Sequence, residues 1–164
     1  MLNLETEIIA AIRRIMRAIE LRSRQLLDQT GVTGPQLAAL QLAAQIENAS
    51  ASAISRHLHL SRSTVTGVLD RLQNRGLIRR NQNARDRRGN VIEVTPRGRD
   101  LLASAPPLLQ DQFRQKLEQL EDWEQTSILA ALQRLAAMMD AEALPVAAVL
   151  DTATANSTAA EDDE

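Results

Sequence analysis

Cysteine is absent from this chain of 164 residues, and its absence excludes several kinds of chemistry. A chain without cysteine cannot form a disulfide, a thiolate zinc site or a thiol redox sensor. Histidine is scarce as well, because the chain has only His57 and His59. A zinc site needs three or four ligands, so we expect no metal site here and assign this pair to a turn or to a phosphate-facing surface.

Membrane and secretion signals are also missing. No apolar stretch approaches the roughly 20 residues that a membrane-spanning helix needs. The N-terminus has neither a basic segment nor a small-residue cleavage site. We therefore expect a cytoplasmic protein with no membrane partner. No nucleophile stands at helical spacing from a base, and there is no glycine-rich phosphate loop, so we expect no catalytic residue, no cofactor and no enzymatic activity.

The charge of the chain is unevenly distributed. The net charge is −2, which by itself argues against a nucleic-acid partner. However, residues 56–99 hold eleven arginines against three acidic residues, a net charge of +8. Residues 1–55 are neutral, and residues 100–164 carry a net charge of −10. A basic block inside an acidic chain is typical of a protein that meets DNA with one face, although a solvated arginine-rich surface is the alternative.

The first half of the chain carries the spacing of amphipathic helices. Apolar residues recur at helical intervals through residues 5–27 and 35–47, and a short third helix is expected at 52–58. Pro35 suits the first turn of the second helix, where its missing N–H is not needed. At 164 residues, the chain has room for one substantial domain.

A tight turn separates the third helix from a fourth. The turn is His59-Leu60-Ser61, and Ser61 is a good N-cap for a helix that runs to about residue 74. Gly76 then stops the helix, and residues 77–80 and 91–95 predict two short strands joined by a hydrophilic loop. A hairpin directly after a helix-turn-helix is a wing. The pattern predicts a mainly α fold, a winged helix-turn-helix with a small β-wing.

Helical spacing returns from residue 97. Pro106-Pro107 is expected to bend or split this helix, because two prolines remove hydrogen-bond donors. A last helix is predicted for about residues 122–143, with Trp123 as a packing anchor. The small, polar and acidic tail at 145–164 is expected to be disordered.

The fourth helix presents two different faces. At helical spacing Val65, Val68, Leu69 and Leu72 point one way, and Arg62, Ser63, Thr66 and Gly67 lie opposite. Arginine can bind guanine bidentately, hydroxyl groups can bind base edges or phosphates, and short side chains let the backbone approach closely. The sequence therefore predicts that this second face enters a groove of DNA.

The order of these features resembles the MarR family of winged helix-turn-helix regulators. The matching stretches are LSRSTVT at 60–66, DRL at 70–72 with RGLIRR at 75–80, and DRR at 86–88 followed by VTPRG at 94–98. The resemblance covers about residues 5–143. His59 replaces a frequent glycine of the family, and Gly67 stands where many members carry a further basic residue.

The resemblance implies an organisation and a function. A single domain would span residues 1–144, with the winged helix-turn-helix at about 34–97 and dimerisation helices at about 5–29 and 98–143. The homodimer would bind an inverted-repeat operator in double-stranded DNA and repress transcription. A small-molecule effector, often aromatic or anionic in this family, would bind between the DNA-reading and dimerisation helices and weaken DNA binding.

The expected DNA contacts fall into two groups. The recognition helix is expected to contribute Ser61, Arg62, Ser63, Thr64, Thr66 and Arg71, and the wing is expected to contribute Arg85, Asp86, Arg87 and Arg88. By resemblance, Asp86 and Arg88 form the Asp-x-Arg pair of the wing, with the arginine in the minor groove. Two alternatives are a constitutive or architectural protein without an effector, and a winged-helix module that binds protein; the arginine block argues against the second.

Overall fold

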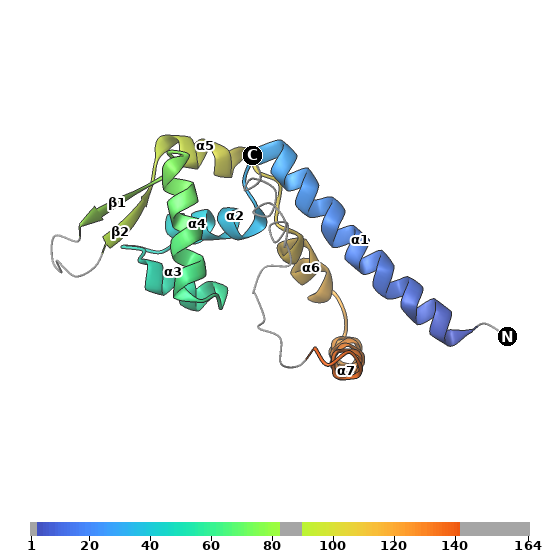
Figure 1. The fold of residues 1–164 in the computed structure, drawn as a ribbon. Coiled ribbons are helices and arrows are strands. Elements are labelled where there is room, and N and C mark those ends of the chain that lie inside the picture. The colour runs from blue at the N-terminus through green and yellow to red at the C-terminus, as the bar shows by residue number, and fades with distance from the viewer. Residues whose placement is uncertain (1–2, 83–89, 142–164) are drawn as a thin grey trace, which may run out of the picture.

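The computed structural model describes residues 3–82 and 90–141, and its order of elements agrees with the sequence pattern (Figure 1). The elements are α1 (Leu4–Thr30), α2 (Gly34–Gln45), α3 (Ala51–Leu58), α4 (Arg62–Asn74), β1 (Ile78–Gln82), β2 (Asn90–Val94), α5 (Pro96–Ser104), α6 (Leu109–Leu117) and α7 (Asp122–Met138). The mainly α fold with a two-stranded wing is confirmed.

The hydrophobic core lies where α2, α3 and α4 pack together and are closed by the strands. The largest side chains with almost no exposed surface are Val32, Leu37, Leu40, Ile54, Val65, Leu69, Leu72, Leu77, Ile78 and Leu108. Each buried aliphatic side chain of this size stabilises the fold by about 1.5–3 kcal/mol relative to an exposed one. This core fixes α4 against the rest of the winged helix-turn-helix.

Local signals in the sequence explain the turns that place α4. The side chain of Ser50 accepts a hydrogen bond from the Ala53 N–H at 3.2 Å and so caps α3. His59 ends α3 in the left-handed region with φ of 49°. Histidine tolerates this conformation better than most residues, so the tight turn forms without the glycine that is frequent in the MarR family.

The wing is an antiparallel hairpin in which Ile78 faces Val94 and Arg80 faces Ile92. The Ile92 N–H donates to the Ala49 carbonyl at 2.8 Å, which ties the hairpin to the segment just before α3. The predicted strands were residues 77–80 and 91–95. In the structure, β1 extends two residues further toward the loop, to Gln82, and β2 begins one residue earlier, at Asn90. The wing therefore has a paired stem up to residues 82 and 90.

The helical arm consists of α1, α6 and α7. The predicted break at Pro106-Pro107 is confirmed, because α5 ends at Ser104 and α6 begins at Leu109. Figure 1 shows α1 running away from the winged helix-turn-helix, with its N-terminal end opposite the wing hairpin. The arm extends beyond the core and leaves much of its surface open.

Two expectations for α7 are corrected. The helix ends at Met138 rather than near residue 143, because Asp140 adopts the left-handed region with φ of 53° and the Ala141 N–H donates back to the Ala136 carbonyl at 2.9 Å. Trp123 does not anchor packing within the protomer, because it is 70% exposed. The predicted acidic tail lies outside the described residues, so its disorder stays a prediction.

Candidate nucleic-acid interface

The recognition helix α4 is buried along one side only. Val65, Val68, Leu69 and Leu72 are buried against the core, as their spacing predicted. The residues predicted to contact DNA are all exposed: Ser61, Arg62, Ser63, Thr64, Thr66 and Arg71. The predicted division of the helix into a core face and an open face is therefore confirmed, and contact of the open face with DNA stays a prediction.

A cluster of hydroxyl groups forms the N-terminal end of α4. Ser61 Oγ accepts a hydrogen bond from the Thr64 N–H at 3.1 Å and caps the helix. The same oxygen lies 2.8 Å from Ser63 Oγ and 2.8 Å from Thr64 Oγ1. Three exposed hydroxyls are thus held together where the helix dipole favours an anion, which suits a phosphate of DNA.

Thr66 lies one turn further along the open face. Its Oγ1 donates to the Arg62 carbonyl at 2.8 Å. Because the hydroxyl proton is used within the helix, the oxygen can still accept a hydrogen bond from outside. Amino groups of adenine or cytosine in the major groove are donors of the kind that this oxygen can accept.

Arg62 and Arg71 supply positive charge to the same helix. Within the part of the chain that the structure describes, neither guanidinium group forms a hydrogen bond or an ion pair. Both side chains are exposed. A guanidinium carries five N–H donors in a planar fork that matches a phosphate or the edge of guanine. These two arginines therefore remain available to a partner outside the protomer.

One contact near the open face was missed by sequence reasoning. The carboxylate of Asp70 on α4 forms an ion pair with Arg80 on β1 at 2.7 Å. The two residues belong to different elements, so no helical or strand spacing brings them together. An available signal was the acid itself, because a carboxylate on a DNA-facing helix repels phosphates unless a cation neutralises it.

The wing carries the second group of expected DNA contacts. Arg85, Asp86, Arg87 and Arg88 lie outside the described residues. Only the stem of the wing is described, and it is joined to α4 through the turn at Gly76, which adopts a φ of 70°. The predicted orientation of Arg88 by Asp86 stays a prediction.

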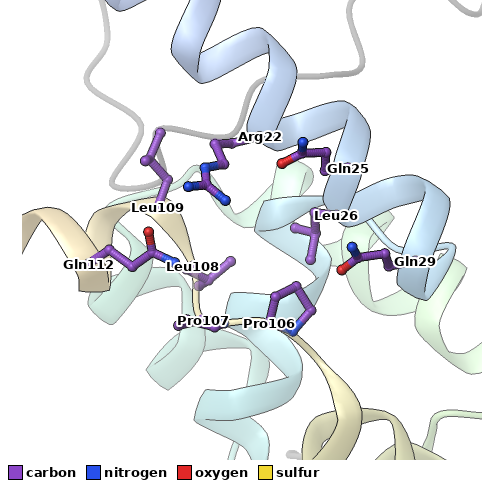
Figure 2. A pocket seen from close by; sticks show the side chains of 9 residues that line it. All are labelled: Arg22, Gln25, Leu26, Gln29, Pro106, Pro107, Leu108, Leu109 and Gln112. Atoms are coloured by element: carbon purple, nitrogen blue, oxygen red, sulfur yellow. The ribbon is translucent and has the colours of Figure 1, made fainter.

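A second site lies away from α4, where α1 passes the segment between α5 and α6. It is a cavity of about 100 Å³. Figure 2 shows the lining side chains, which are Arg22, Gln25, Leu26, Gln29, Pro106, Pro107, Leu108, Leu109 and Gln112. The lining combines apolar surface, amide groups and one arginine. Such a lining suits a small molecule with an apolar body and an acidic group.

Comparison with known proteins agrees with this geometry. The MarR family model matches residues 32–89, which hold α2, the helix-turn-helix and the first strand of the wing. A candidate transcriptional regulatory protein for the hcr operon of Thauera aromatica is 30% identical over 127 residues, which are 77% of this chain and 72% of the relative. The chain belongs to the MarR family. It is a DNA-binding transcriptional regulator, and members of this family are regulators rather than enzymes.

Solved structures share the fold of this MarR-family regulator. The S. aureus MepR–DNA complex aligns with a TM-score of 0.59 and 24% identity, over 79% of this chain and 96% of that chain. CouR from Rhodococcus jostii RHA1, bound to p-coumaroyl-CoA, aligns with a TM-score of 0.56 and 24% identity, over 83% of this chain and 96% of that chain. Within residues 3–82 and 90–141, no helix of this MarR-family regulator is long and apolar enough to cross a membrane.

Proposed function

We propose that this MarR-family regulator is a homodimeric repressor that binds an inverted-repeat operator and leaves it when a small-molecule effector binds. The observation that carries the proposal is the uneven burial of apolar side chains. The winged helix-turn-helix buries its own core, while the arm keeps an apolar surface that a second copy can cover.

The exposed apolar side chains gather on the arm. Large hydrophobic residues with open surface on α1, α6 and α7 are Leu4, Ile8, Ile9, Ile15, Met16, Leu21, Leu27, Phe113, Trp123, Ile128, Leu129, Leu132 and Met138, with Met139 directly after α7. A soluble monomer rarely leaves so many large apolar side chains open to water along its helices. Pairing of the terminal helices between two copies would remove this surface from water, and we assign dimerisation to them.

The opposite side of α1 is polar. Glu20 is flanked by Arg17 and Arg24, one turn away on either side. The hydrogen bond from Arg17, together with the charge of Arg24, lowers the pKa of the Glu20 carboxyl. This charged row marks the solvent side of α1, so the apolar row on the other side is the one left for a partner helix.

A two-fold dimer determines the form of the operator. Its two α4 helices would enter successive major grooves on one face of the duplex, about one helical turn or roughly 10 base pairs apart. We propose DNA contacts by Ser61, Arg62, Ser63, Thr64, Thr66 and Arg71. The wing, through Arg85, Arg87 and Arg88 with Asp86 as the orienting group, would contact the adjacent minor groove.

The cavity beside α1 is the proposed effector site. Among its lining residues are Leu26 of α1 and Leu108, which belong to the hydrophobic core that supports α4. A ligand there would therefore touch both the dimerisation helix and the DNA-reading unit. Arg22 would bind an acidic group of the ligand, and the prolines and leucines would contact its apolar body. At about 100 Å³ the cavity is smaller than most ligand sites, so a small organic acid fits best.

Selection of DNA from a random-sequence pool tests the operator. The wild-type protein is expected to enrich an imperfect inverted repeat, and Arg62→Ala is expected to weaken binding by about 1–3 kcal/mol, with unequal losses across single-base variants of that repeat. Fluorescence anisotropy measures both. Equal losses on every duplex would instead make Arg62 a phosphate contact, and enrichment of no sequence would contradict specific recognition.

A thermal-shift panel tests the effector. Small aromatic acids are added to the wild type and to Arg22→Gln, and the melting temperature is followed. An effector is expected to raise the melting temperature of the wild type, to do so less for the variant, and to release the selected duplex. A ligand that stabilises both proteins equally would place its site elsewhere. The absence of any shift across a broad metabolite panel would favour a constitutive repressor.

A further inference from the structure

Arg80, in the stem of the wing, ties β1 to the recognition helix at two points. Its Nη2 nitrogen lies 2.7 Å from the Asp70 carboxylate and donates to the Thr66 carbonyl at 3.4 Å. Thr66 and Asp70 are four residues apart and so lie on one side of α4. A single side chain therefore bridges the element expected in the major groove and the hairpin expected in the minor groove.

The bridge lies at an open groove. A hollow of about 310 Å³ is lined by Thr66 and Arg80, by residues 50–52 at the start of α3, and by Asn90 and Ile92 of β2. Most of these groups are polar, and Arg80 supplies the positive charge among the lining residues. Between the two grooves of a duplex runs its sugar-phosphate backbone. A protein that reads both grooves must accommodate that backbone between helix and wing, which is where this hollow lies.

The charges explain why the pair is placed there. The Asp70 side chain is 50% exposed, and the Arg80 side chain is 24% exposed. An unpaired carboxylate at this position would repel the DNA backbone, whereas a paired one holds the guanidinium in a fixed orientation. Both bridging contacts use one nitrogen of a group that carries five N–H donors. The paired Arg80 guanidinium thus keeps free N–H donors for the groove, while the pairing restricts the motion of the side chain.

We propose that Arg80 contacts a backbone phosphate in the groove between α4 and the wing, and that Asp70 is a positioning residue that holds Arg80 there. Neither residue belongs to the contacts inferred from the sequence. The inference rests on the proposed mode of operator binding, with α4 in the major groove and the wing in the minor groove.

A double-mutant cycle tests the pair. The variants are Asp70→Asn, Arg80→Met and their combination, and the probe is a fluorescently labelled duplex selected by the wild-type protein from a random pool. Anisotropy gives the Kd at several NaCl concentrations. Arg80→Met is expected to weaken binding on the order of ten-fold and to reduce the slope of log K against log salt by about one unit.

The sign of the Asp70→Asn effect is the decisive readout. In the wild-type background, loss of the carboxylate is expected to weaken binding a few-fold, although the protein loses a negative charge, because Arg80 is no longer held. In the Arg80→Met background, the same change is expected to tighten binding, because an unpaired acid has been removed. Tighter binding in both backgrounds would make Asp70 a bystander and overturn the proposal.

Arg79→Met is the matched control. Arg79 precedes Arg80 on β1, has the same charge and faces Glu93 across the hairpin. Its side chain therefore lies on the other face of the strand, away from α4. Its loss is expected to leave the salt slope closer to that of the wild type than Arg80→Met does. If both arginine variants changed the affinity and the slope equally, the effect would be one of net charge.

Melting temperatures separate positioning from folding. Because the pair is partly exposed, its variants are expected to melt close to the wild type. A large fall in the melting temperature of Asp70→Asn, with an unchanged salt slope for Arg80→Met, would make the bridge purely structural. Failure of the wild-type protein to select any duplex would contradict the proposed function, whereas a wrong sign for Asp70→Asn contradicts this inference alone.

Discussion

The winged helix-turn-helix and the helical arm both carry apolar residues at helical spacing, but only the first region buries most of them within the protomer. Leu37, Leu40 and Leu69 in the first region have no exposed surface. Met16 on α1 and Met138 on α7 are 64% and 73% exposed. Both regions form regular helices, so the difference does not lie in helix formation. It lies in whether one chain provides the surface against which the apolar side packs.

This difference indicates which part of the molecule buries its apolar side chains without a partner. The winged helix-turn-helix buries its core side chains within one chain, so burial of this core does not require a second copy. The arm has no such core in the protomer: α6 and α7 contain no buried residue, and α1 buries only Ser23 and Leu26. Variants in the two regions should therefore fail in different ways, and this expectation can be measured.

The largest effect is expected for Leu69→Ala in α4. Leu69 is fully buried in the core, and removing its side chain should destabilise the fold by about 2–5 kcal/mol through lost burial and the cavity left behind. Urea unfolding followed by circular dichroism measures the loss. The difference in unfolding free energy between Leu69→Ala and the wild type should be the same at low and high protein concentration, and a difference that changes with concentration would contradict a core completed within one chain.

Leu132→Glu in α7 should act on assembly instead. Leu132 is 48% exposed in the protomer and lies on the apolar side of α7. Placing a charge in a proposed helix-pairing surface should shift light scattering from the dimer mass to the monomer mass, because an unpaired charge is costly to bury. Affinity for an inverted-repeat duplex should fall steeply, because the two half-sites are no longer bound as a unit.

Arg134→Glu is the control for this variant. Arg134 lies two residues further along α7, on the opposite side of the helix at helical spacing, and is exposed. It changes the charge by more than Leu132→Glu does, yet it should leave the dimer mass unchanged. Dissociation by both variants would point to charge repulsion rather than to the apolar surface.

The sequence predicts the local features of both regions, but not how separate elements are oriented against each other. His59 in the turn, Ser61 as a cap and the break at Pro106-Pro107 follow from local conformational preferences, and the structure confirms each of them. Local preference also gives the buried side of α4. These features depend on neighbours within a few positions, which is the range over which spacing and capping rules act.

Features that depend on the angle between elements could not be predicted in the same way. The contact of Asp70 with Arg80 requires the path of the chain through Gly76 as well as the register of β1 with β2. The end of α7 was also missed, because Met139 and Ala141 are good helix formers and the left-handed turn at Asp140 nevertheless ends the helix. The exposure of Trp123 reflects a surface that a single chain does not cover.

Two glycines inside helices, Gly98 in α5 and Gly67 in α4, differ in the same way: one is surrounded by the protomer and the other faces open space. A Cβ added to Gly98 in α5 would lie 2.2 Å from the Leu77 carbonyl oxygen and 2.7 Å from Val94 Cγ1. Gly98→Ala should therefore force α5 away from the wing stem and destabilise the fold by about 1–3 kcal/mol, which thermal unfolding measures. A variant as stable as the wild type would show that Leu77 and Val94 in the wing stem can move aside at little cost.

The smallest and opposite effect is expected for Gly67→Ala in α4. A Cβ added there meets no atom of the described protein within 4 Å, and the residue does not adopt a positive φ. Glycine inside a helix costs about 0.5–1 kcal/mol relative to alanine, so the substitution should stabilise the fold by roughly that amount. Nothing in residues 3–82 and 90–141 accounts for glycine at this position. Gly67 lies on the open face with Ser63, where DNA would approach the helix backbone.

The same substitution should therefore weaken binding of the selected duplex while it raises the melting temperature. Such opposite shifts would mean that this part of α4 is shaped by its partner, as the arm is, and not by the core. If Gly67→Ala stabilised the protein and bound the duplex as tightly as the wild type, the glycine would have no role in recognition.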